Sequence, residues 1–443
     1  MISGFKLALY AVMTAPLIIL TAARTVKGLK PMTVMQAAVI LFLIFSIISA
    51  ALSEFGAVTL LGAHRYEGLA SCLLYTLMFL CLSVNLKPAR WQLYVFAAAV
   101  SLMCVVIFLQ YKGLNPLGLF PRGLSYLDSD VLYSGKYAGT TGNAGLTASL
   151  LSAAAALFAF AVIRLGGQFR LLLIPALLSA FILGRLGISA GNLALAAALV
   201  IAIPVMASDR QRLVRLLTVY PLILAAWGFD RLRAPAWCLI ILTLIAALLL
   251  YKFKPEIKRI RLYMLLALIV ICLLALTYVW LYKGQQYGAI YEANRLMHGV
   301  WDDSYGNGRL FIWRRVWELV KERPLFGGGP DTLGLRGLPP YVWYSDTAEV
   351  HTYITAAHNE YLNVLVNQGL FAAVCYLALP VITAVNLYRS KRESVIIASG
   401  AALCYAVGAF FSISMCASAT FYWLLLSYAD NNNQSGDKLE GIK

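Results

Sequence analysis

Residues 262–281 read LYMLLALIVICLLALTYVWL, a run of twenty residues without a charged side chain. A helix of this length and polarity is long enough to cross the hydrocarbon core of a bilayer. Comparable apolar runs recur along the chain, for example at 32–52 and 69–86. The chain of 443 residues is 61% hydrophobic and 13% charged, with a mean hydropathy of +0.76, which argues against a water-soluble fold. We therefore expect an all-α, polytopic membrane helix bundle of about 12–13 transmembrane helices.

Lysine and arginine residues set the orientation expected for this bundle. Loops rich in them alternate with poorer loops at intervals of one helical hairpin, and short cytoplasmic loops accumulate these residues, so the rich loops are predicted to lie inside. The longest outward segment, 284–357, is the least lipid-like part of the chain, and we expect function there. The other outward connections are expected at 54–68, 111–142, Arg185 and Asp230–Arg233. The basic loops contain Arg24/Lys27/Lys30, Lys87/Arg90, Arg164/Arg170, Arg210/Arg212/Arg215, Lys252/Lys254/Lys258/Arg259/Arg261 and Arg389/Lys391/Arg392.

One membrane domain accounts for the chain. We expect it to cover 1–430, with 284–357 as its long extracytoplasmic loop and 431–443 as a disordered polar tail. The net charge of +16 is spread over short loops rather than gathered in a basic soluble domain, so no nucleic-acid partner is expected. The eight cysteines lack CxxC or metal-ligand spacing and are interpreted as free packing thiols. Leu7–Ala23 is interpreted as a retained helix rather than a cleaved signal peptide.

An amphipathic helix is predicted inside the long outer loop, from Arg309 to Arg323. Large apolar residues recur at helical spacing from Leu310 to Val320, charged residues occupy the other faces, and Pro324 ends the pattern. Such a helix suits either the headgroup region of the bilayer, where it would meet lipid phosphates, or simple packing over the bundle. The residues alone leave both interpretations open.

Three further outward features admit a chemical role beside an ordinary structural one. The run Gly327-Gly328-Gly329-Pro330 either brings backbone amides close to an anion or forms a tight turn, and the absence of a GxxxxGK[ST] pattern favours the turn. His358 opens an apolar span and is either a general base, kept neutral by the helix dipole, or an interfacial cap. Arg185 lies in a glycine-broken turn, where it either pairs with a phosphate or snorkels to the interface.

Two stretches in this region carry a recognisable pattern. The first is Gly308-Arg309, Trp313 and then Pro324-Leu325 with the glycine cluster; the second is His358-Asn359-Glu360-Tyr361-Leu362 followed by Gly369-Leu370. They resemble the GR…W…PL.G.G and HN.YL……GL stretches of the O-antigen ligase and O-antigen polymerase superfamily. This pair is fairly specific for that family of bacterial envelope glycan enzymes.

Weaker matches extend the resemblance over residues 65–377. Arg65-Tyr66-Glu67-Gly68-Leu69 is similar to an R.EGL segment, Thr140-Thr141-Gly142-Asn143 to a T.GN segment, and Ser189-Ala190-Gly191 to an SRG turn of the family. The family's arginine in that turn is Ala190 here, and a glycine usual after the GL pair is Ala372. Arg185 stands one helical turn before Ser189 and would replace the missing cation if both residues face the same cavity, since residues four apart share one helical face.

The resemblance implies a membrane-embedded glycosyltransferase of GT-C-like architecture that acts on an undecaprenyl-diphosphate-linked oligosaccharide. His358 would be the general base for an acceptor hydroxyl, and Arg309, with Arg185 as second cation, would bind the departing diphosphate. Inversion at the anomeric carbon would follow from single displacement. No cofactor and no metal are expected, since the outer loops hold few carboxylates and Asp302-Asp303 lacks a partner motif. Further substrate-loop candidates are Arg65, Asn359, Tyr361, Gly327 and Gly329.

Two questions remain open in the sequence. A ligase and a polymerase share these motifs and differ only in whether the acceptor is a separate envelope molecule or another lipid-linked glycan. A transporter or flippase of lipid-linked glycans is the alternative function, and a structural or sensory membrane protein is a third reading. The expected surroundings are the plasma (inner) membrane, with a multi-pass chain and an active site on the extracytoplasmic side.

Overall fold

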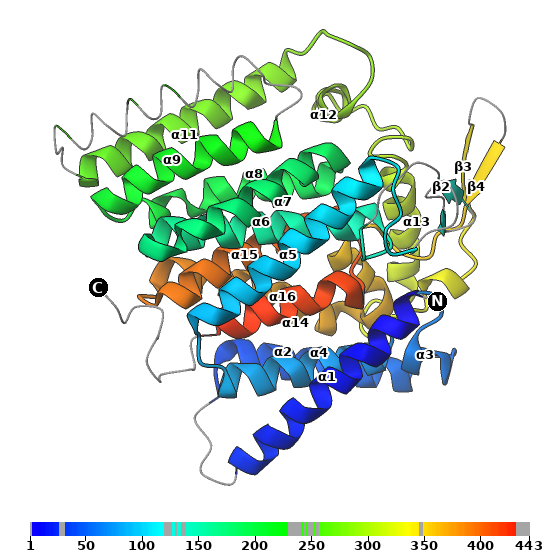
Figure 1. The fold of residues 1–443 in the computed structure, drawn as a ribbon. Helices are drawn as coiled ribbons and strands as arrows, with labels where there is room; N and C mark the ends of the chain where they lie inside the picture. The colour runs from blue at the N-terminus through cyan, green and yellow to red at the C-terminus, as the bar shows by residue number, and fades with distance from the viewer. Residues whose placement is uncertain are drawn as a thin grey trace.

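The computed structural model describes residues 2–25, 32–118, 126–128, 131–133, 139–228, 257–344 and 349–430, together with positions 241, 245 and 252. Most long helices lie side by side with their axes in nearly one direction, and the loops of the candidate site gather at one end (Figure 1). This arrangement confirms the all-α bundle expected from the sequence. The bundle helices are α1 (Ile2–Thr25), α2 (Val34–Ala51), α4 (Leu69–Asn85), α5 (Arg90–Tyr111), α6 (Ala144–Leu165), α7 (Leu173–Leu186), α8 (Ser189–Met206), α9 (Arg210–Trp227), α11 (Ile257–Trp280), α14 (Glu360–Arg389), α15 (Glu393–Ala409) and α16 (Cys416–Ala429).

Six helices among the described residues are long and apolar enough to cross a membrane: α2, α5, α6, the 167–186 segment ending in α7, α8 and α14. Three shorter apolar helices lie at 4–19, 69–85 and 393–409. The run that opened the sequence argument lies almost entirely in α11. Residues 229–240, with the turn expected at Asp230–Arg233, and the tail 431–443 fall outside the described residues, so the number of about 12–13 spans stays a prediction.

Helix α6 forms the centre of the bundle. In its most apolar stretch of 18 residues, 94% of the residues are buried, and α7, α8 and α15 pack directly around the helix. The small side chains of Ala153, Ala154, Ala155 and Ala156 are fully buried and let these neighbours approach closely. Because α6 has 22 residues, it reaches about 33 Å from one end of the bundle to the other.

Helix α14 is broken near its middle, at Gly369. This glycine has φ 83° and ψ 179°, a conformation that residues with a side chain rarely adopt. The segment 324–329 forms hydrogen bonds to α14 on both sides of the break. Leu370 N donates to Pro324 O at 2.8 Å, and Gly329 N donates to Asn367 O at 2.7 Å. The segment from Pro324 to Gly329 is thereby inserted against the kink, and α2 packs along α14.

The outer region carries short elements between α11 and α14. The helix predicted at Arg309–Arg323 is confirmed as α13 (Arg309–Glu322), with α12 (Ala289–Met297) before it and the 3-10 segment η3 (Leu333–Leu335) after it. Elsewhere in the chain, α3 (Val58–Leu61) lies between α2 and α4, and the 3-10 segment η2 (Gly167–Leu172) lies between α6 and α7. Two small antiparallel hairpins were not expected. They pair β1 (Tyr126–Asp128) with β2 (Val131–Tyr133) and β3 (Tyr341–Tyr344) with β4 (Glu349–Thr352). The aromatic and β-branched run Tyr341-Val342-Trp343-Tyr344 is typical of a strand.

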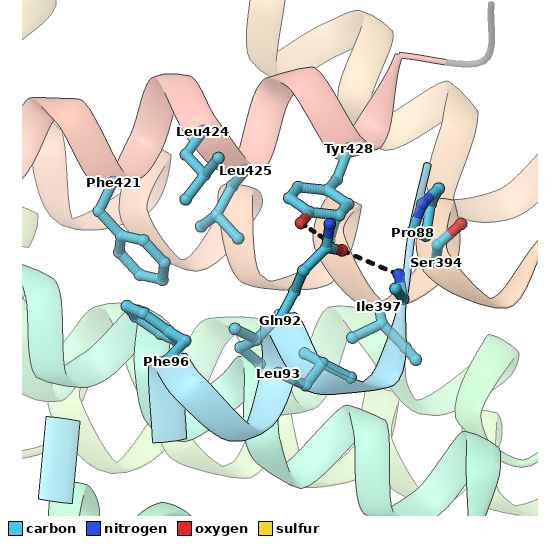
Figure 2. Close-up of a pocket in the computed structure, with 13 residues that line it drawn as sticks. Pro88, Gln92, Leu93, Phe96, Ser394, Ile397, Phe421, Leu424, Leu425 and Tyr428 are labelled. Atoms are coloured by element: carbon cyan, nitrogen blue, oxygen red, sulfur yellow. Dashed lines mark hydrogen bonds between the residues drawn. The ribbon is translucent and has the colours of Figure 1, made fainter. Parts of the chain in front are cut away.

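An apolar pocket lies between α5, α15 and α16, at the end of the bundle away from α13. Figure 2 shows Gln92 reaching toward Tyr428, with Phe96, Leu93 and Phe421 along the wall. Gln92 Oε1 accepts hydrogen bonds from Tyr428 Oη at 2.9 Å and from Ala89 N at 2.8 Å, so its acceptor is satisfied inside the protein. No titratable acid, base or cation lines this pocket apart from the Tyr428 hydroxyl. The chemistry must therefore be sought elsewhere.

Candidate active site

The loop between α3 and α4 is fixed by one buried carboxylate from a distant part of the chain. Asp331 follows the glycine cluster, and its Oδ2 accepts from the backbone N–H of Arg65 at 3.0 Å, His64 at 3.4 Å and Glu67 at 3.5 Å. Ala63 N also donates to Asp331 O at 3.1 Å. Burial raises the pKa of Asp331, while the three amides act in the opposite direction. The loop that carries Arg65 is thus positioned by the loop that follows α13.

His358 stands two residues before the first residue of α14. Asn359 caps that helix by accepting from Leu362 N at 3.1 Å, and His358 itself has a positive φ of 50°. The residue before it, Ala357, accepts from Trp313 Nε1 at 2.9 Å and donates to Asn363 Oδ1 at 3.2 Å. These contacts hold the histidine backbone between α13 and α14. Among the described residues, no hydrogen bond to the His358 ring is formed, which leaves its nitrogens available to a ligand.

Arg309 is the first residue of α13. Trp313 lies four residues later, on the same helical face, and is anchored beside His358, so Arg309 faces the same region. Arg309 Nη1 donates to Gly306 O at 2.7 Å, while its buried Nε has no hydrogen-bond partner. Burial lowers the pKa of Arg309, with Glu292 acting in the opposite direction. The guanidinium is nonetheless a permanent cation with unused hydrogen-bonding capacity.

Arg65 supplies a second cation from the loop between α3 and α4. Its Nη2 donates to Thr355 Oγ1 at 2.8 Å, and its Nη1 lies 3.8 Å from Met415 Sδ. Its Nε is also buried without a partner. No ion pair involving Arg65 or Arg309 is formed within the described residues. The hydrogen bonds of both arginines are therefore to uncharged groups, and their positive charges are available to an anionic ligand.

The electrostatics of His358 join these residues into one site. Burial, followed by the positive charges of Arg65 and Arg309, lowers the pKa of His358 to about 3. The imidazole is therefore neutral at physiological pH and has a nitrogen able to accept a proton. A neutral base between two cations, with part of its surface still open, suits proton abstraction beside an anionic leaving group.

Three carboxyl groups lie behind this site, around a small internal cavity of about 40 Å³. Glu67, Asp331 and Glu360 contribute them, together with the amide of Gln368. Tyr75 Oη donates to Glu67 Oε1 at 2.8 Å, and Glu360 Oε2 accepts from Ser414 N at 3.0 Å. Burial raises the pKa of Glu67 well above its ordinary value. The cavity has room for about three water molecules, which would join these acceptors.

The sequence argument did not single out these carboxyl groups as functional. Glu67 and Glu360 stand inside two of the quoted motifs, so their neighbourhood was recognised. For Asp331, the only feature of the sequence that could have indicated a place near the site is its position directly after the glycine cluster. Among the described residues, no group of histidine, cysteine and carboxylate side chains has the geometry of a metal site. Asp303, one of the two outer-loop acids, instead pairs with Arg314 at 2.5 Å.

Arg185 lies in different surroundings from those of His358. Its Nη1 donates to Tyr111 Oη at 3.2 Å, and its guanidinium lies 5.3 Å from the ring centres of both Tyr111 and Phe181. The argument that Arg185 and Ser189 share a helical face is wrong. Helix α7 ends at Leu186, Gly187 turns the chain with φ 67°, and Ser189 starts α8, so the two residues belong to different helices.

The remaining sequence candidates have structural partners. Asn359 is the cap of α14, and Tyr361 Oη donates to Ala406 O at 2.7 Å, which links α14 to α15. The glycine amides are used inside the protein: Gly327 N donates to Arg323 O at 3.0 Å, and Gly329 N donates to Asn367 O at 2.7 Å. The cluster is thus a tight turn packed against the kink of α14, which agrees with the turn interpretation favoured by the sequence.

Comparison with known families now adds an independent observation. Residues 216–377 match the family model described as O-Antigen ligase. The match confirms the resemblance to the O-antigen ligase and polymerase superfamily. It covers Arg309, Asp331 and His358, whereas Arg65 lies outside it. No curated protein matches the chain. Together with its apolar helices, the match supports a multi-pass membrane protein with a glycan transferase region of the O-antigen ligase type.

Proposed function

We propose that this protein transfers an oligosaccharide from undecaprenyl diphosphate to an acceptor hydroxyl, at the outer face of the plasma (inner) membrane. The observation that carries the proposal is the placement of two arginines around His358: Arg309 begins the helix whose Trp313 donates to Ala357 O, and Arg65 donates to Thr355 Oγ1. The family match over 216–377 supports the reaction class. The orientation rests on the alternation of basic loops, which assigns the end of the bundle that carries His358 to the outside.

The proposed reaction is a single displacement. The acceptor oxygen attacks the anomeric carbon while His358 takes its proton, and the bond from that carbon to the diphosphate oxygen breaks. The electron pair leaves with the lipid diphosphate, and the configuration at the anomeric carbon is inverted. Arg309 and Arg65 stabilise the growing negative charge by charge-assisted hydrogen bonds. The proton on His358 is then lost to water or to the leaving diphosphate.

Arg65 fits the role of second cation better than Arg185. It acts on His358 together with Arg309, whereas the contacts of Arg185 are with Tyr111 and Phe181. The buried Nε atoms of Arg65 and Arg309 both lack partners, and a diphosphate oxygen would satisfy them. Two fixed guanidinium groups meet the charge requirement of a diphosphate leaving group, so we propose a metal-independent reaction.

The experiment that tests the function separates transfer from transport. Purified protein in proteoliposomes is given undecaprenyl-diphosphate oligosaccharide and candidate acceptors, with EDTA throughout, and sugar transfer and lipid translocation are measured in parallel. His358→Ala is compared with wild type, and the exposed His351→Ala serves as control.

We expect transfer by wild type and by His351→Ala, and its loss in His358→Ala, with no translocation that depends on His358. Translocation without transfer by wild type would instead establish a flippase, the alternative function. Transfer that requires a divalent ion would reject the metal-independent mechanism. The products decide between ligase and polymerase, because a polymerase makes a ladder of repeats and a ligase makes one attachment.

A further inference from the structure

A second cluster of arginines lies at the other end of the bundle, about one length of α6 away from the candidate site. It surrounds an open cleft of about 450 Å³ between the C-terminal end of α6, η2 and the first turns of α9. Leu165, Gly166 and Val214 form its apolar and backbone walls, and Arg170, Arg210 and Arg215 face it. Neither the family match nor the proposed reaction assigns a role to this cleft.

The charges around the cleft do not balance within the described residues. Two carboxylates are present, and both are already engaged by other arginines. Glu393 bonds Arg164 at 2.6 Å and Arg212 at 2.6 Å, and Asp209 pairs with Arg212 at 3.1 Å. Among the described residues, neither carboxylate forms an ion pair with Arg170 or Arg215, which both line the cleft.

Arg215 shows the imbalance most directly. Its guanidinium lies against Gly166, and a side chain at that position would collide with it. Its Nη1 is buried without a hydrogen-bond partner, and its only described hydrogen bond is from Nε to Gln211 O at 3.3 Å. The charged groups that act on it are Asp209, Arg212, Arg170 and Glu393. Leaving such a donor buried and unsatisfied is costly, which indicates that an anion completes the site.

Arg170 completes the geometry from η2. Its side chain is exposed, and no described residue forms an ion pair with it. The guanidinium groups of Arg170 and Arg215 at one opening match the oxygens of a phosphate, which arginine binds in a bidentate manner.

We propose that this cleft binds the phosphate of an anionic phospholipid headgroup. The position favours a lipid over a soluble anion, because the cleft lies where membrane-spanning helices end and Leu165 and Val214 offer an apolar wall beside the cations. Basic pockets between helices on the cytoplasmic side are suited to anionic headgroups. The site would tie α6, η2 and α9 together at the end of the bundle opposite His358.

The test is the thermal stability of the delipidated full-length protein in neutral detergent. Its melting temperature is followed during titration with phosphatidylglycerol, with phosphatidylcholine of the same acyl chains, and with inorganic phosphate. We expect a saturable increase with phosphatidylglycerol and none with phosphatidylcholine. In Arg170→Gln and Arg215→Gln the half-saturating concentration should rise by about tenfold, as expected for the loss of one charge-assisted contact.

The matched control is Arg389→Gln, an exposed arginine at the same end of the bundle and outside the cleft, which should respond as wild type does. Arg170 is exposed, so its substitution leaves the fold intact even if Arg215→Gln is unstable. An equal response to inorganic phosphate would support the phosphate site but assign it to a free anion. Equal stabilisation by phosphatidylcholine, or an unchanged response in Arg170→Gln, would overturn the proposal.

Discussion

Arg164 and the two arginines of the candidate site lie at opposite ends of the bundle and differ in how completely their hydrogen-bond donors are satisfied. At one end, Arg164 is fully engaged: Nε and Nη2 bond Glu393 at 2.6 and 2.8 Å, and Nη1 donates to Val205 O at 2.9 Å. At the other end, Arg65 and Arg309 each keep a buried Nε without a hydrogen-bond partner, and among the described residues neither forms a direct ion pair with a carboxylate. The first arrangement is complete in itself, and the second is not.

The difference separates charges that hold the fold from charges that await a ligand. Removing one member of a buried ion pair is strongly destabilising, because the other charge stays buried without a partner. A buried cation with unused donors is maintained at a cost and is a candidate functional group. On this basis, breaking the Arg164–Glu393 pair should affect stability, and substituting Arg65 or Arg309 should affect transfer.

The largest effect on stability is expected from Glu393→Ala. It would leave Arg164 buried without its carboxylate partner and cost about 3–5 kcal/mol of unfolding free energy. Thermal unfolding in detergent measures this. The control is Glu318→Ala, which removes an exposed pair with Lys321 and should cost about 0.5 kcal/mol or less. Equal losses in the two variants would show that the buried pair has no special role.

After the substitution of His358, the largest loss of transfer activity is expected from substituting Arg309 or Arg65. Arg309→Ala and Arg65→Ala should each lower kcat/KM for transfer by about 10²–10³-fold, because each removes a donor to the leaving diphosphate. Arg314→Ala, on the exposed side of the same helix, should stay close to wild type. If Arg185→Ala lowered transfer as strongly as Arg65→Ala, the assignment of the second cation would have to be reversed.

The pH dependence sharpens the comparison further. Because His358 has a pKa of about 3 in the folded protein, it stays neutral at pH 5, where an ordinary histidine of pKa about 6.5 is mostly protonated. The acidic limb of kcat/KM should therefore lie below pH 5. Arg309→Gln removes one repelling charge, raises the pKa of His358 and should move that limb to higher pH.

The same shift predicts the sign of a stability effect. The unfolded state protonates this histidine below pH 6.5 and the folded state only near pH 3, so its contribution to stability is lost as pH falls between these values. For the activity profile, an acidic limb of kcat/KM near pH 6.5 in wild type that does not move in Arg309→Gln would contradict the electrostatic coupling of His358 and Arg309.

The smallest effect is expected at the start of α14. Asn359→Ala removes the side chain that accepts from Leu362 N and should cost about 1 kcal/mol of stability. Asn359→Asp keeps an acceptor at the cap and should recover most of the loss. Thermal unfolding distinguishes the two. A large loss of transfer in Asn359→Asp at normal stability would show that the amide touches substrate as well.

The sequence predicted those parts of the fold and site that depend on local pattern. Apolar length identified the helices, helical spacing identified α13, and a quoted motif identified the neighbourhood of His358 and Arg309. Each of these depends on residues close together in the chain, so one sequence is sufficient to find them.

Long-range contacts could not be predicted in the same way. Arg65 and Asp331 are 266 positions apart, and nothing in either segment indicates that the amides of one loop bind the carboxylate of the other. The sequence favoured a turn for the glycine cluster but left an anion-binding role open. Two of the carbonyls that accept from its amides, those of Val366 and Asn367, belong to the distant helix α14. Arg185 was misplaced because helical spacing was carried across the turn at Gly187, where α7 ends.

The most direct test of the account is to measure donor affinity and single-turnover transfer rate separately in His358→Ala and Arg309→Ala. We predict that His358→Ala binds the lipid-diphosphate donor as wild type does but transfers about 10²–10⁴-fold more slowly, whereas Arg309→Ala weakens donor binding as well. A His358→Ala protein that transfers at the wild-type rate would contradict the central claim that this histidine is the base.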